Sequence, residues 1–262
     1  MGALLGLDEE PAVAVREGGG PFVIVCEHAS NRMPRALGLL GLTVADLERH
    51  IAFDPGAADL AAEIARRVDG ALVLQRYSRL VIDCNRSPEQ PDAISTLSET
   101  TEIPGNRGLS PEDRAARVAA IWHPFHAALE HLLDQRRAAA RGAILVTVHS
   151  FNPVYRGVSR LWHAGIITTR NRAFADAVRE HLSQDRGLNV GDNQPYSAKD
   201  NVDYTIRRHG ADRELDNVMI EIRNDLLRTP GDVDAWADRL TQAIEDSARQ
   251  GGRVQADSAI ES

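Results

Sequence analysis

Three short apolar runs in this chain each stop at a cluster of side chains that bind metals or move protons. The runs span residues 22–25, 143–148 and 217–220, and the clusters after them contain Glu27 and His28, then His149 and Ser150, then Glu221. Each run is too short and too rich in β-branched residues for an amphipathic helix, and is typical of a buried parallel strand. Ligands of open α/β sheets bind beyond the carboxyl ends of the strands, so the clusters are expected to meet there. Two histidines and a glutamate at one edge make the minimal set for a metal-assisted hydrolase.

Helical and strand patterns alternate along the rest of the chain. Helices are predicted within 43–68 with a break at Asp54-Pro55-Gly56, at 110–141 with a bend at Pro124, and at 173–182 and 232–249. Further strands are predicted at 71–74, 80–82 and 165–169. Polar loops are predicted at 88–109 and 187–210. This alternation predicts a three-layer α/β fold, in which helices cover both faces of a mostly parallel sheet. We expect one α/β hydrolase-type domain over 21–249, a flexible segment over 1–20 and a flexible tail over 250–262.

The composition argues against several classes of partner. A net charge of −8 and an isoelectric point near 5.6 give no general attraction to nucleic acid or to anionic membranes. No apolar run approaches the length of a membrane span, and the N-terminus lacks the basic start of a signal peptide. Cys26 and Cys84 lie beside apolar runs and are expected to be buried and reduced. We therefore expect a cytoplasmic protein, whose oligomeric state the sequence does not predict.

His28 and His149 are the candidate ligands of Zn²⁺ or another divalent metal. A neutral imidazole held at a strand end is a common zinc ligand. The alternative is that each histidine closes a strand edge and hydrogen-bonds a loop, which is the commoner role of a single such residue. Two histidines and an acid at comparable positions strengthen the metal interpretation.

The third metal ligand is expected to be a carboxylate, either Asp54 or Glu27. Adjacent strand residues point to opposite faces, which disfavours joint ligation by Glu27 and His28. Asp54 stands at a helix break before Pro55-Gly56, where its side chain can face the sheet edge. We therefore expect Asp54, with the alternative that it caps the helix that follows.

Glu221 is the candidate general base. It interrupts an otherwise apolar strand, and a buried glutamate is costly unless it has a partner or a chemical role. Beside a metal-bound water it would accept the water's proton. The alternative is a structural salt bridge, with Arg223 as one possible partner.

Arginines near these clusters are candidates for holding substrate carboxylates, because a guanidinium binds a carboxylate with two parallel hydrogen bonds. The candidates are Arg79, Arg86 and Arg207. Polar residues that could support the site are Glu27, Ser30, Asn31, Asp83, Asn85, His126, Ser150 and His209.

An ordered set of motifs resembles the N-formylglutamate amidohydrolase family over most of the chain. The motifs are Glu27-His28-Ala29-Ser30, the segment 50–56, Tyr77-Ser78-Arg79 with 82–86, Trp122-His123-Pro124-Phe125-His126, Val148-His149-Ser150, the segment 204–210 and the strand that ends at Glu221. The resemblance implies an α/β fold like that of zinc-dependent exopeptidases. It also implies a metal bound by His28, His149 and a carboxylate such as Asp54, with Glu221 as the base.

The expected function is therefore a zinc-dependent amidohydrolase that cleaves an N-acyl amide, such as an N-formyl amide, of an acidic amino acid or a related small anionic molecule. One alternative is a non-catalytic carboxylate-binding protein that keeps the same fold. A second alternative is a metal-dependent peptidase or a cell-wall amidase, and the lack of an export signal counts against the cell-wall amidase.

Overall fold

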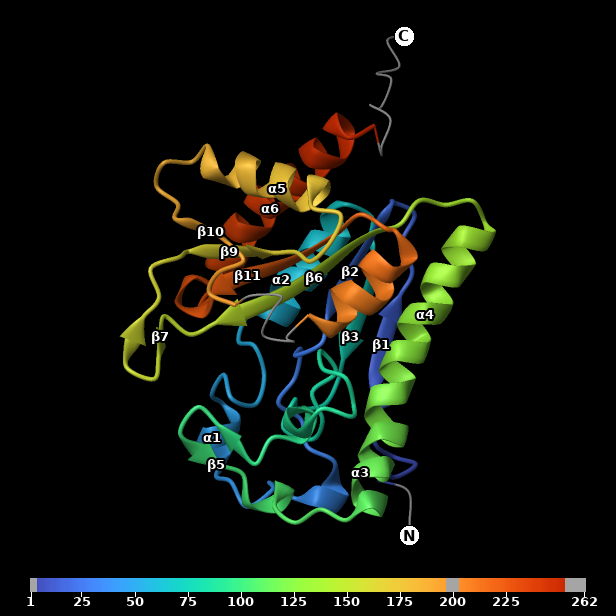
Figure 1. Cartoon of the computed structure of the whole chain (residues 1–262), viewed down its shortest axis with the longest axis vertical. Helices are drawn as coiled ribbons and strands as arrows, with labels where there is room; N and C mark the ends of the chain where they lie inside the picture. The colour runs from blue at the N-terminus through green and yellow to red at the C-terminus, as the bar shows by residue number, and fades with distance from the viewer. Residues whose placement is uncertain (1–3, 197–202, 253–262) are drawn as a thin grey trace.

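A seven-stranded mixed sheet forms the centre of the computed structural model, which describes residues 4–196 and 203–252 (Figure 1). The strands are β1 (Val13–Arg16), β2 (Phe22–Cys26), β3 (Ala71–Gln75), β6 (Ile144–Phe151), β9 (Ala164–Ile167), β10 (Val190–Asp192) and β11 (Asn217–Arg223). They lie in the order β1-β3-β2-β6-β11-β9-β10. The central strands β3, β2, β6 and β11 are parallel, and antiparallel pairings attach β1 to β3 and β9 to β11.

Helices cover both faces of the sheet, which confirms the predicted three-layer α/β fold. One face carries α2 (Ala57–Arg67), α5 (Ala173–Ser183) and α6 (Pro230–Gln250), and the other carries α4 (His123–Ala138) (Figure 1). The shorter helical elements include α1 (Val44–Leu47), α3 (Pro111–Arg117) and the π-helical turns η4 (Val118–Trp122) and η6 (Ile206–Gly210). Two small hairpins are formed by β4 (Leu97–Ser98) with β5 (Thr101–Glu102) and by β7 (Val154–Tyr155) with β8 (Val158–Ser159). No helix in the described part of the chain is long and apolar enough to cross a membrane.

The alternation of side chains along β2 separates the two cores. Phe22, Ile24 and Cys26 enter the core under α2, α5 and α6, whereas Val23 and Val25 enter the core under α4. All five side chains are buried. A strand that is buried on both faces has an unbroken apolar sequence, which explains why the apolar runs identified the central strands.

Local signals set the helix boundaries. The Ser110 hydroxyl accepts a hydrogen bond from the Asp113 amide at 3.0 Å and begins α3, while Thr229 and Asp232 form a reciprocal cap that begins α6. Between α1 and α2 the chain turns at Gly56, which has a φ of 79° and on which a Cβ would lie 2.5 Å from the Leu227 Cβ. Glycine is required there on both grounds.

Several sequence-based assignments are corrected by the structure. Residues 80–82, predicted as a strand, form a turn whose apolar side chains are buried without joining the sheet. Part of the segment 1–20, expected to be flexible, forms β1 on the sheet edge. The predicted loops at 88–109 and 187–210 contain the β4–β5 hairpin, β10 and η6. Of the tail predicted over 250–262, residues 253–262 lie outside the described part of the chain.

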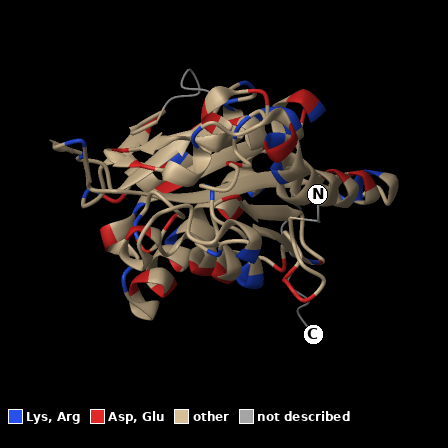
Figure 2. Ribbon diagram, turned by 90° about the horizontal axis from the view of Figure 1, so that it is seen from below, with Lys and Arg blue, Asp and Glu red and all other residues tan. Residues whose placement is uncertain are grey.

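Acidic and basic side chains are interspersed over the outer helices (Figure 2). Arg67 on α2, for example, contacts Glu63 on the same helix at 2.9 Å and Asp234 on α6 at 2.5 Å. Surface pairs of this kind contribute little stability. The packing of α2 on α6 therefore depends on buried apolar residues such as Ile64 and Leu240.

Candidate active site

The carboxyl ends of β2, β6 and β11 bring the predicted site residues together at one edge of the sheet. The chain leaves β2 through Glu27 and His28, and His149 in β6 lies opposite Glu221 in β11 in parallel register. Asp54 joins them from the turn before α2, where its amide donates a hydrogen bond to the His28 carbonyl at 3.0 Å. The loops that carry α1 and β5 lie beyond these strand ends (Figure 1).

His28, His149 and Asp54 present three donor atoms to one point. The Nδ1 atoms of the two histidines are 3.2 Å apart, and Asp54 Oδ2 lies 3.1 Å from Nδ1 of His28 and 3.0 Å from Nδ1 of His149. These separations are close to the roughly 3.3 Å between neighbouring ligand atoms around a tetrahedral zinc with bonds of about 2.0–2.1 Å. All three residues are buried, and together they form a group that could hold a metal ion.

A carboxylate lies behind each histidine. Nε2 of His28 is 2.8 Å from Oδ1 of Asp83, and Nε2 of His149 is 3.1 Å from Oε2 of Glu27. A carboxylate favours a proton on the nitrogen that faces it, which leaves the lone pair on Nδ1 for a metal. Glu27 therefore lies on the far side of His149 from the donor atoms, and the geometry favours Asp54 over Glu27 as the third ligand.

The second oxygen of Asp54 is held by Arg79 and lies beside His50. Oδ1 accepts a hydrogen bond from Nη1 of Arg79 at 3.1 Å and lies 3.2 Å from Nε2 of His50. Arg79 also donates through Nη2 to Asp83 at 3.0 Å, so one guanidinium joins the two carboxylates on either side of His28. Asp54 does not cap α2, because the residue at the cap position is Gly56.

Burial and charge oppose each other in this cluster. Burial favours the neutral form of Asp54, but the charge of His28 and hydrogen bonds from His149, His28 and His50 outweigh it and hold the pKa of Asp54 well below its usual value. Burial likewise opposes protonation of His149, yet Glu27 and Asp54 raise its pKa well above the usual value. A dense group of buried carboxylates thus needs positive charge beside it.

Glu221 is buried beside the donor atoms, and its side chain makes no ion pair with any residue that the structure describes. Its side chain is 5% exposed, and Oε2 has no hydrogen-bond partner among the residues that the structure describes. Burial is the main reason why the pKa of Glu221 rises to about 7, against the opposing charge of His149. Arg223, the suggested salt-bridge partner, instead donates to Asp225 at 2.7 Å.

A cavity of about 270 Å³ opens over these residues. Its floor includes His28, Asp54, His149 and Glu221. Its mouth lies between the two small hairpins, because Leu97, Ser98 and Glu99 line one side, and Tyr155 and Arg156 line another. The metal-binding group and the unpaired carboxylate therefore face a space in which a small molecule could bind.

Sequence comparison places this site in a known family. The sequence profile of the N-formylglutamate amidohydrolase family matches residues 20–228, a range that includes all of the residues named above on the cavity floor. This chain belongs to that family. The resemblance seen in the motifs of the sequence is thereby confirmed.

Individual relatives agree with the family assignment. The product of gene Atu2144 from Agrobacterium tumefaciens is 39% identical, with a TM-score of 0.92 over 95% of this chain and 99% of that chain. N-formylglutamate amidohydrolase from Ralstonia eutropha JMP134 is 20% identical, with a TM-score of 0.68 over 92% of this chain and 100% of that chain, which shows a common fold. N-formylglutamate deformylase from Pseudomonas putida is 30% identical over 155 residues, which are 54% of this chain and 55% of the relative. The match spans about half the length of such curated relatives.

The predicted substrate-binding arginines of this N-formylglutamate amidohydrolase family member have different positions. Arg79 and Arg86 line the cavity. Arg207 does not: it is exposed on η6, with its guanidinium carbon 5.9 Å from the centre of the Tyr204 ring. The turn η6 contacts β6, and Arg207 is not among the described residues that line the cavity. Its predicted role in binding substrate is therefore corrected.

The predicted supporting residues fall into two groups. Asn85 and Ser150 line the cavity together with Asp83. Ser30 and Asn31 instead hold the loop after β2. The Ser30 hydroxyl accepts a hydrogen bond from the backbone amide of Arg32 at 3.0 Å, and the side-chain amide of Asn31 donates one to the Leu47 carbonyl at 2.9 Å.

His126 and His209 form a buried pair outside the cavity. Nδ1 of His126 lies 2.9 Å from Nε2 of His209, and Nε2 of His126 donates to the Cys84 carbonyl at 2.9 Å. Because Cys84 stands between Asp83 and Asn85, the pair supports the loop that carries both of these residues.

Several residues of the cavity were not predicted as site residues. His50 is one: its Nε2 donates to the Ser150 carbonyl at 2.6 Å, and its position four residues before Asp54 was an available signal. Tyr155, Arg156 and Tyr196 are others. They come from a two-residue strand, the turn after it and an irregular segment, which are too short for a periodic pattern, so the sequence offered no comparable signal for them.

Proposed function

We propose that this protein is a metal-dependent amidohydrolase that removes an N-acyl group from an acidic amino acid, with the N-formyl derivative as the first candidate substrate. The observation that carries the proposal is one cavity that contains both a two-histidine, one-carboxylate donor group and the buried, unpaired carboxylate of Glu221. A metal-ligand group with a nearby base is the arrangement that hydrolysis of an amide by water requires.

The donor set suits zinc. His28, His149 and Asp54 would hold the ion, with Asp83 and Glu27 fixing the two imidazole tautomers. A bound divalent ion supplies Lewis acidity to the amide carbonyl and lowers the pKa of water. Arg79 and His50 keep Asp54 ionised and oriented toward the two histidines.

Glu221 would take the proton from the attacking water and return it to the nitrogen of the leaving amine. Its position in β11 fixes it directly across from His149 in β6, on two paired strands of the rigid central sheet. A base on a strand is held more precisely than one on a loop, which favours a productive geometry.

The cavity also suggests an acidic substrate. Arg86 lines it and lies 3.2 Å from Asp92 and 3.7 Å from Asp83, and Arg156 stands at its mouth. We assign these two guanidiniums to substrate carboxylates. Arg79 keeps a supporting role, because its hydrogen bonds of 3.1 and 3.0 Å to Asp54 and Asp83 hold the carboxylates beside His28, whereas the contact of Arg86 with Asp83 is longer, at 3.7 Å. The names of the relatives make N-formylglutamate the substrate to test first.

Hydrolysis of a matched panel tests the proposal. Zinc-loaded protein is expected to release free amine from N-formylglutamate, N-formylaspartate or N-acetylglutamate much faster than from N-formylleucine or N-formyllysine. Glu221→Gln should lower kcat by roughly 10²–10⁴-fold while zinc content and thermal unfolding remain as in the wild type. Glu63→Gln, on the outer surface of α2, is the control and should leave kcat unchanged.

The alternatives give different results in the same assay. A carboxylate-binding protein would bind N-formylglutamate without hydrolysing any amide in the panel, and a peptidase would cleave dipeptides in preference to N-formyl amino acids. Undiminished turnover by Glu221→Gln would contradict the role of Glu221 as the base.

A further inference from the structure

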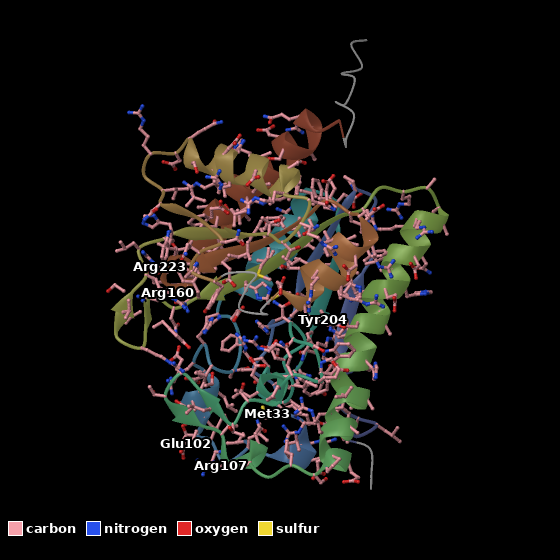
Figure 3. The ribbon with its side chains drawn as sticks, in the orientation of Figure 1. Met33, Glu102, Arg107, Arg160, Tyr204 and Arg223 are labelled. Carbon is pink, nitrogen blue, oxygen red and sulfur yellow. The ribbon has the colours of Figure 1, made fainter. Side chains whose placement is uncertain are left out.

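Arg160 holds the hydroxyl of a cavity tyrosine. Its guanidinium carbon lies 4.6 Å from the ring centres of both Tyr155 and Tyr196, and its Nη1 donates a hydrogen bond to the Tyr196 hydroxyl at 3.0 Å. Arg160 follows β8 and lies on the β7 side of the molecule (Figure 3). Tyr155 and Tyr196 both line the cavity, whereas Arg160 does not. A planar cation between two rings restricts the position of both.

Two glycines let the segment that precedes Tyr196 lie against the sheet. Gly165 in β9 is the register partner of Glu221, and a Cβ on Gly165 would lie 1.9 Å from the carbonyl oxygen of Gln194. A Cβ on Gly191 in β10 would lie 2.7 Å from the Gln194 Cβ. The chain therefore passes directly over the strand position beside Glu221 just before it reaches Tyr196.

The hydrogen bond from Arg160 determines what the Tyr196 hydroxyl can do. A phenol has one O–H proton and accepts through its oxygen, and a guanidinium can only donate. The oxygen therefore accepts from Arg160, and the proton remains available for another acceptor. Within the described residues, no acceptor for that proton is found. Burial, and next the charge of Glu221, raise the pKa of Tyr196 to about 12, so the phenol keeps its proton at neutral pH.

We propose that the Tyr196 hydroxyl donates a hydrogen bond to the carbonyl oxygen of the scissile amide, and that Arg160 is the positioning residue that orients it. This inference rests on the proposed amidohydrolase function. As water adds to the carbonyl carbon, the C=O π bond becomes a lone pair on oxygen, and a fixed donor stabilises this charge more than it stabilises the substrate. The phenol proton stays on Tyr196, so the proton transfers remain with Glu221.

Removal of one hydroxyl tests this role. Tyr196→Phe is expected to lower kcat by roughly 10²-fold with KM changed by less than about threefold, because only transition-state binding is lost. Its affinity for a phosphonamidate analogue of the tetrahedral adduct should fall by the same factor, while product affinity stays constant. Zinc content and thermal unfolding should match the wild type. Tyr204→Phe, on the α4 side and outside the cavity, is the matched control (Figure 3).

A double-mutant cycle tests the part played by Arg160. Arg160→Gln should lower kcat in the wild type but have little further effect in Tyr196→Phe, since it acts through the missing hydroxyl. Independent effects of the two changes would overturn the positioning role. A Tyr196→Phe variant with normal kcat, or with a raised KM alone, would overturn the role of Tyr196. Wild-type protein that cleaves no N-acyl amino acid would instead contradict the proposed function itself.

Discussion

The two oxygens of Asp54 have different neighbours, and this division gives the residue its place in the site. Oδ2 faces Nδ1 of His28 and of His149, while Oδ1 faces Arg79 and His50. A carboxylate held on one oxygen by a guanidinium presents the other oxygen in a fixed direction. Asp54 can thus serve as a ligand of low mobility even though it comes from a turn.

Replacement of Asp54 should remove the metal. Asp54→Ala is expected to reduce zinc per chain to a small fraction of the wild-type value, because two histidines alone bind zinc weakly. Asp54→Glu should retain part of it. Zinc measured by atomic spectroscopy after gel filtration checks this, with Asp234→Ala on the exposed side of α6 as the control. Full zinc occupancy in Asp54→Ala would transfer the ligand role to Glu27.

At the residue scale, sequence reasoning grouped candidate side chains where each follows directly from a regular element. His28, His149 and Glu221 could be grouped because each stands at the end of an apolar run, and strand ends meet at one edge. Tyr196 and Arg160 could not be grouped, because they are 36 residues apart along the chain and are joined only by tertiary packing. No local pattern records a contact of that kind.

At the scale of elements, β9 and β10 position the segment that completes the cavity. β9 pairs antiparallel with β11, and β10 pairs parallel with β9, so the chain that leaves β10 returns across Gly165 toward the cavity. This arrangement depends on the absence of a side chain at Gly165. β10 and the residues after it up to Tyr196 are therefore part of the site, although their sequence resembles a loop.

Gly165→Ala should displace this segment. The added methyl group would lie 1.9 Å from a backbone oxygen, a contact that no side-chain rotation can relieve. We expect a loss of kcat at least as large as that of Tyr196→Phe, with zinc binding retained because the metal group lies on other elements. Gly142→Ala is the control, since a Cβ there would meet only the Pro21 Cβ at 3.8 Å. Unchanged kinetics in Gly165→Ala would contradict this account of β9.

Element prediction failed where burial was not accompanied by strand pairing. Val81 and Ile82 are fully buried against the core under α4, and an apolar run in a buried turn has the same composition as one in a strand. Conversely, β1 is short and half exposed, and its few apolar residues between Pro11 and Gly18 did not distinguish a strand from a flexible segment. Tertiary packing decided both cases.

At the scale of the whole molecule, buried histidines outside the metal group make stability depend on pH. Burial, and next the charge of His126, lower the pKa of His209 to about 2, and burial lowers the pKa of His126 to about 4. Both stay neutral in the folded protein down to those values, whereas unfolded histidine binds a proton below about pH 6.5. Below about pH 6.5 the unfolded state therefore binds more protons than the folded state. The contribution of the two neutral histidines to the free energy of unfolding is complete above about pH 6.5 and is lost as the pH falls below it.

His209→Gln isolates one of these groups. Glutamine can still donate a hydrogen bond to Nδ1 of His126 but does not titrate. Between pH 7 and pH 5 the wild type should lose about 2 kcal/mol more unfolding free energy than the variant. This loss arises over the roughly 1.5 pH units between the pKa of unfolded histidine and pH 5, at about 1.4 kcal/mol per unit. Urea unfolding at both pH values measures the difference. Parallel stability curves would show that His209 is protonated in the folded state.

The central claim is that His28, Asp54 and His149 hold one catalytic metal ion, and a zinc titration of metal-stripped protein tests it most directly. Activity on the preferred amide and bound zinc are measured on the same samples as zinc is added. The account predicts that activity is absent at the start, rises in proportion to bound zinc and reaches a plateau at one ion per chain. Full activity of the stripped protein, unchanged by added zinc, would contradict it.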